Sequence, residues 1–75
     1  MEPAEMVARL IAREDHPLKV WREYRGFTQE ALGSSAGVGK SYIGQIEAGN
    51  KVGSAQVLKA LAEELQVDME DLLLE

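Results

Sequence analysis

The chain has 75 residues, of which 45% are hydrophobic and 28% charged, with no cysteine and a formal net charge of −5. This length suits one small domain, and without cysteine the fold has neither a disulfide nor a thiolate metal site to stabilise it. No apolar run approaches the roughly 20 residues that span a bilayer, and the charged amino terminus is unlike a signal peptide. We therefore expect a cytoplasmic protein that does not enter a membrane.

The charges are unevenly distributed along the chain. Residues 1–16 carry −2, residues 17–53 carry +2 and residues 54–75 carry −5. The protein can therefore have a basic face although its net charge is negative, but its long-range attraction of a polyanion should be weak. Affinity for such a partner would depend on close contacts and on dimerisation.

An amphipathic helix is predicted to open the chain near Pro3, a favourable residue for a first turn. Its apolar stripe comprises Met6, Val7, Leu10 and Ile11. The stripe either packs on the remaining chain or contacts a dimer mate or a partner protein. A polar break at residues 14–16 follows, so we divide the chain into residues 1–16 and a domain of residues 17–75.

The second predicted helix starts at Pro17 and is ended by Gly26. Its inward-facing residues are Leu18, Trp21 and Tyr24. Thr28 then offers a side-chain oxygen to the first turn of the next helix, which is the usual role of an N-cap residue.

Residues 28–46 read TQEALGSSAGVGKSYIGQI and predict two short helices joined by a tight turn. Gly37 reaches a positive φ cheaply, as the turn requires, and the small Gly33 allows the second helix to cross the first. Ile43 and Ile46 lie on the buried face of the second helix, at residues 40–47. This pattern is typical of a helix-turn-helix and indicates DNA binding.

Two further helices are predicted after a loop at residues 50–53. Ser54 caps the first, whose core stripe comprises Val57, Leu58, Leu61, Ala62 and Leu65. Asp68 caps a last short helix containing Leu72, Leu73 and Leu74. Three consecutive leucines cannot all face one core, so Leu72 and Leu74 are our favoured dimer contact, with Met6, Leu10 and Ile11 as the alternative.

The chain resembles the Cro/cI-like, or XRE-type, helix-turn-helix regulators from about residue 17 to residue 73. The residues that carry the resemblance are Leu18, Trp21, Arg22, Gly26, Phe27, Thr28, Gln29, Leu32, Gly33, Gly37, Val38, Ser41, Ile43, Ile46, Glu47 and Gly49. The resemblance implies an all-α, compact five-helix, lambda-repressor-like domain, to which the amino-terminal helix is an addition. Trp21 stands where the family usually has Leu, and Gly33 where Ala is commoner.

The second motif helix is expected to enter the major groove of double-stranded DNA with its amino end first. The expected DNA-binding residues are Gln29, Lys40, Ser41, Tyr42, Gln45, Asn50 and Lys51. Gln45 suits a bidentate contact to adenine, Lys40 a guanine or a phosphate, and Ser41 a base edge or the backbone. Tyr42 would lie along the backbone or contact a thymine methyl.

The resemblance adds a phosphate contact for Gln29 at the start of the first motif helix. Asn50 and Lys51 are expected to contact the DNA backbone on the far side of the second motif helix. The resemblance also implies an ion pair between Arg22 and Glu47. This pair would set the angle of the second motif helix, the recognition helix, without contacting a base.

Two functions remain open after these observations. The leading one is a sequence-specific transcriptional regulator, a repressor that binds a palindromic operator as a homodimer. Small members of the family are often autorepressors or antitoxins, which the resemblance alone suggests here. The alternative is a protein-interaction module that holds a basic partner, such as a toxin, through the amphipathic first helix and the acidic carboxyl end.

Neither a nucleotide site nor an enzyme is expected. Residues 34–41 read SSAGVGKS, close to a phosphate-binding loop, but a helix rather than an apolar strand precedes them. His16 has no second histidine or cysteine to share a metal with, and the acidic residues near the carboxyl end suit a solvated face. We therefore expect no catalytic residue, no metal and no cofactor.

Overall fold

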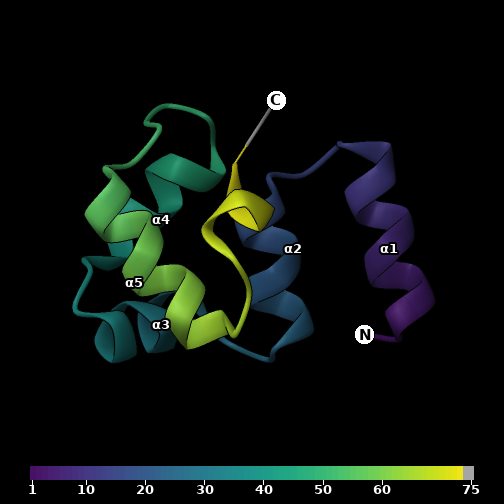
Figure 1. Ribbon diagram of the computed structural model, residues 1–75, viewed down its shortest axis with the longest axis horizontal. Helices are drawn as coiled ribbons and strands as arrows, with labels where there is room; N and C mark the ends of the chain where they lie inside the picture. The colour runs from purple at the N-terminus through teal and green to yellow at the C-terminus, as the bar shows by residue number, and fades with distance from the viewer. Residues whose placement is uncertain (74–75) are drawn as a thin grey trace.

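Five α-helices and one 3-10 helix form the computed structural model, which describes residues 1–73 (Figure 1). They are α1 (Pro3–Ala12), α2 (Pro17–Tyr24), α3 (Gln29–Ala36), α4 (Lys40–Glu47), α5 (Ala55–Leu65) and the 3-10 helix η1 (Met69–Leu72). Residues 1–73 contain no strand, so the predicted all-α helix-turn-helix fold is confirmed. The last predicted helix is the single 3-10 turn η1.

The predicted N-caps position α3 and α5. Thr28 Oγ1 accepts a hydrogen bond of 3.0 Å from the Ala31 amide, and Ser54 Oγ accepts one of 3.2 Å from the Val57 amide. Each cap satisfies a first-turn N–H group that has no partner within its own helix. Before η1, the Asp71 carboxylate accepts a bond of 3.0 Å from the Asp68 amide.

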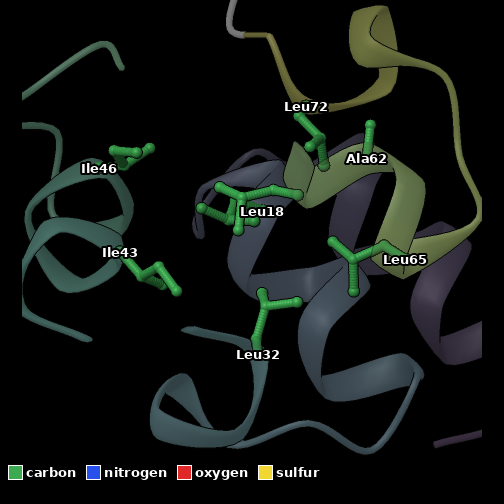
Figure 2. Packing of buried hydrophobic residues seen from close by; sticks show 8 residues of the cluster. Leu18, Leu32, Ile43, Ile46, Ala62, Leu65 and Leu72 are labelled. Carbon is green, nitrogen blue, oxygen red and sulfur yellow. The ribbon is translucent and has the colours of Figure 1, made fainter. Parts of the chain in front are cut away.

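Side chains from α2, α3, α4, α5 and η1 meet in a single core (Figure 2). The core residues are Leu18, Leu32, Ile43, Ile46, Leu61, Ala62, Leu65 and Leu72. Trp21 is partly buried against this cluster, and Tyr24 is half-buried. Val20, which the pattern did not single out, is fully buried.

Helix α1 packs against α2 and lies beside the bundle formed by the other helices (Figure 1). Of its apolar stripe, Met6 is buried and Leu10 half-buried, whereas Val7 and Ile11 are 47% and 75% exposed. The stripe therefore packs on the domain through one edge and leaves the other in solvent. No helix within residues 1–73 is long and apolar enough to cross a membrane.

The expected dimer contacts must be corrected. Leu72 is 1% exposed and belongs to the core, because η1 folds back onto α5, and Met6 is buried as well. Neither side chain is free to contact a second copy. Leu73 is 40% exposed, and Leu74 lies outside the described residues.

The turn between α3 and α4 depends on two glycines for different reasons. Gly37 has φ +72°, and its conformation ends α3. At Gly33, a Cβ atom would lie 2.5 Å from the Val38 carbonyl oxygen, because the chain doubles back against α3 there. The Val38 amide donates a 2.9 Å hydrogen bond to the Gly33 carbonyl across the same turn. The predicted positive φ at Gly37 is confirmed.

Candidate nucleic-acid interface

Helix α4 buries one face and exposes the other. Ile43 and Ile46 are fully buried, whereas Lys40, Ser41 and Gln45 are exposed. The exposed side therefore carries an ammonium, a hydroxyl and an amide, three groups that form hydrogen bonds with base edges and phosphates.

A buried ion pair joins α2 to the end of α4. The Arg22 guanidinium donates to both carboxylate oxygens of Glu47, from Nε at 2.7 Å and from Nη2 at 3.1 Å. Its third nitrogen, Nη1, donates to the Phe27 carbonyl at 2.9 Å. The hydrogen bond to Glu47 raises the pKa of Arg22, against the lowering effect of burial. Such a two-pronged contact limits rotation of α4 relative to α2.

Gln29 belongs to the same network, which the sequence did not indicate. Its side-chain amide, at the first position of α3, donates a hydrogen bond of 3.0 Å to Glu47 Oε1. A Cβ atom at Gly44 would lie 3.7 Å from the Gln29 amide, in ordinary van der Waals contact. The Gln29 side chain therefore lies across α4 beside Gly44, and one carboxylate links three helices.

An open hollow separates the amino end of α3 from the amino end of α4. It is lined by Arg22, Phe27, Thr28, Gln29, Glu30, Ala31, Ser34 and Lys40. Amide groups at the start of a helix and a neighbouring lysine are a suitable environment for a phosphate. The structure thus brings Gln29 and Lys40 to one hollow, as would be required if both side chains contacted the phosphate backbone of a nucleic acid there.

Tyr42 and Lys51 lie together on another flank of α4. The half-buried Tyr42 hydroxyl accepts a hydrogen bond of 3.3 Å from the Ser54 amide, and Lys51 Nζ lies 5.3 Å from the centre of its ring. Tyr42 is therefore packed into the fold, unlike Ser41 and Gln45. Asn50 and Lys51 are exposed, and their amides donate to the Gln45 carbonyl, which holds the loop against the end of α4.

Comparison with known proteins agrees with this geometry. The family described as "Helix-turn-helix domain" matches residues 16–74. The chain belongs to this family. It is also 31% identical over 55 residues to a Bacillus subtilis protein, the uncharacterized HTH-type transcriptional regulator YazB. That alignment covers 73% of this chain and 80% of YazB. No solved structure matches the chain.

The helix-turn-helix assignment makes α3 and α4 the two motif helices of an XRE-like, DNA-binding regulator. The match begins at residue 16, so α1 precedes the matched helix-turn-helix segment. Within residues 1–73, no group of three or more His, Cys, Asp or Glu side chains is arranged to hold a metal ion.

Two arginines outside the helix-turn-helix motif have structural contacts that the sequence did not indicate. Arg25 Nε donates a 2.8 Å hydrogen bond to the Leu65 carbonyl at the end of α5, and its guanidinium lies over the Trp21 ring. Arg9 pairs with Asp15 at 2.8 Å and with Glu23 at 2.6 Å. The Leu65 and Glu23 partners lie 40 and 14 residues away in the sequence, so no local spacing could reveal these two contacts.

Proposed function

We propose that this protein is a sequence-specific transcriptional repressor that inserts α4 into the major groove of a palindromic operator. The observation that carries the proposal is the buried network of Arg22, Glu47 and Gln29. It braces the helix whose outer side carries Lys40, Ser41 and Gln45. A rigidly held recognition helix presents its side chains to base edges at small entropic cost.

Each side chain has a role in this proposal. Gln45 and Ser41 read base edges, and Lys40 contacts either a guanine or a phosphate. Gln29 contacts a phosphate at the amino end of α3, in the hollow that Lys40 also lines. Asn50 and Lys51 contact the backbone beyond the carboxyl end of α4. Tyr42 lies beside Lys51, and its hydroxyl, which accepts from the Ser54 amide, keeps its own O–H to donate to a phosphate.

We propose that the protein binds its operator as a homodimer, because one module buries little surface on a half-site. Leu72 is buried, so we propose instead a contact surface that contains Val52, 80% exposed, and Leu73, 40% exposed. Both side chains line one hollow of about 150 Å³. Val52 lies in the loop between α4 and α5, so this surface begins close to the carboxyl end of α4 in the chain.

Selection of bound duplexes from a random DNA pool tests this function. We expect enrichment of a palindrome whose half-sites are about one helical turn apart. Recovery of no preferred sequence would contradict sequence-specific binding.

A second function is favoured by a different observation. Val7 and Ile11 remain exposed on α1, and residues 54–75 carry a charge of −5. These features suit a protein-interaction module with a basic partner, and an antitoxin would combine both functions. The division of the chain into residues 1–16 and 17–75 belongs to this proposal, with α1 as the partner-binding addition. Loss of partner binding on Ile11→Asp, with DNA binding unchanged, would support it.

A further inference from the structure

The hollow on the α2 side of the recognition helix is acidic, in contrast to the hollow that contains Lys40. It has a volume of about 280 Å³. Its lining residues are Glu14, Asp15, His16, Lys19, Arg22, Gln29, Gly44, Glu47 and Ala48. Gln29 and Arg22 also line the hollow beside Lys40, so the two hollows adjoin each other along α4.

Most charges in the acidic hollow are paired. Glu47 is paired with Arg22, and Asp15 lies 2.8 Å from Arg9 and 3.5 Å from Lys19. Glu14 forms no ion pair within residues 1–73 and is exposed. The hollow therefore retains one uncompensated negative charge.

The backbone on either side of Glu14 is held by its neighbours. Arg9 bridges Asp15 in the linker and Glu23 on α2, and the side chain of His16 accepts a hydrogen bond of 3.0 Å from the Leu18 amide. Arg13, at φ +57°, ends α1 in a left-handed turn directly before Glu14. The chain is thus held both before and after Glu14.

We propose that Glu14 is a repulsive element that lowers the affinity of this protein for duplex DNA. The inference rests on the proposed function, in which phosphates pass Gln29 at the edge where the two hollows meet. Glu14 lines the acidic hollow together with Gln29, so its negative charge acts on those phosphates through a field that salt screens over about 10 Å at 0.1 M. Phosphate contacts contribute to the binding of every duplex, so Glu14 weakens specific and non-specific binding alike, and discrimination depends on the bases that α4 reads.

Glu14 lies in the linker that joins α1 to the segment that matches the family. The matched segment begins at residue 16, and Glu14 and Asp15 immediately precede it. Met6 buries α1 against the domain, so the linker is attached to the folded body on both sides.

The test compares Glu14→Gln with Glu63→Gln in the full chain. Glu63 is exposed on α5 and lines neither hollow, and both changes alter the net charge equally. Fluorescence anisotropy would be measured on the selected duplex and on a scrambled duplex of equal length, over a range of salt concentrations.

We expect Glu14→Gln to strengthen binding to both duplexes about threefold or more at low salt, with a steeper salt dependence. Glu63→Gln should change the affinity less than about twofold. Equal effects of the two variants, with the selected duplex still bound, would overturn the assignment of Glu14 alone. If the parent protein binds neither duplex, the proposed function fails, and the role of Glu14 fails with it.

Discussion

Gln29 and Glu47 are joined by a hydrogen bond of 3.0 Å that connects the first residue of α3 to the last residue of α4. The same carboxylate receives two hydrogen bonds from Arg22 on α2. The Glu47 side chain is only 5% exposed, so both of its oxygens depend on these partners instead of water. The Glu47 carboxylate at the end of α4 is therefore bound by side chains from two other helices, α2 and α3.

Removal of one partner should be costly because it leaves a buried charge unpaired. We expect Glu47→Ala to lower the free energy of unfolding by about 3 kcal/mol and to weaken DNA binding. The double variant Arg22→Met/Glu47→Leu should be more stable than Glu47→Ala, since it buries no charge. Urea denaturation measures both effects.

Lys19→Met is the matched control, because the Asp15–Lys19 pair is exposed and should contribute less than about 1 kcal/mol. A double-mutant cycle that yields no coupling between Arg22 and Glu47 would contradict the role of the pair.

Gly37 tests the backbone of the turn without a steric complication. A Cβ atom there meets nothing within 4 Å, so the positive φ is the cost that Gly37→Val is expected to reveal. We expect a loss of more than about 1 kcal/mol for Val and a smaller loss for Asn, which tolerates this conformation. Gly39→Ser is the control, since Gly39 is an N-cap residue with φ −63° and equally open space. Equal melting temperatures for Gly37→Val and the parent would disprove the reason given for the glycine.

Lys51 and Gln45 should affect DNA binding in different ways. Lys51→Ala should weaken binding to every duplex and reduce the salt dependence by about one unit of slope, as expected for a phosphate contact. Gln45→Ala should cost about 1–3 kcal/mol on the selected operator and relax specificity at one base pair. The dependence of binding on salt concentration in Lys40→Ala would show whether Lys40 contacts a phosphate or a base. If neither Lys51→Ala nor Gln45→Ala changes binding, α4 is not the reading helix.

His16 should make stability depend on pH. Burial lowers its pKa below the ordinary value of 6.5, although the charge of Glu47 acts in the opposite direction. Below pH 6.5 the unfolded chain therefore binds more protons than the folded chain, so this contribution is present above that pH and is lost as the pH falls. The slope from one proton is at most about 1.4 kcal/mol per pH unit.

The control is His16→Asn, because asparagine also caps a helix but does not titrate. The difference in unfolding free energy between His16→Asn and the parent should change between pH 7.5 and the acid range, in favour of the variant at low pH. A constant difference would show that His16 has the same pKa in both states.

Dimerisation should depend on the surface that contains Val52 and Leu73. Sedimentation should show a dimer of the parent at high micromolar concentration and a monomer for Val52→Asp. Loss of the second half-site should weaken operator binding by about tenfold or more. Ile11→Asp serves as the control for an equally exposed apolar residue on α1. A parent that remains monomeric both with and without the operator would contradict the dimer.

Local patterns determined the helices and the motif of this protein. The spacing of apolar residues, the oxygen-bearing caps Thr28 and Ser54, and the glycine at the turn act within a few residues of each other, so the sequence predicts them directly. The resemblance to the XRE-type regulators rests on the same residues, and the family match confirms it.

Only the tertiary structure decided which groups share partners. Three contacts depend on how separate helices cross. They are the burial of Leu72 in the core, the hydrogen bond from the Ser54 amide to Tyr42, and the hydrogen bond from Gln29 to Glu47. The packing of α1 through Met6 and the pairing of Arg9 with Glu23 depend on it too. Crossing angles follow from the packing of whole helix surfaces, and a short stretch of sequence does not contain that information.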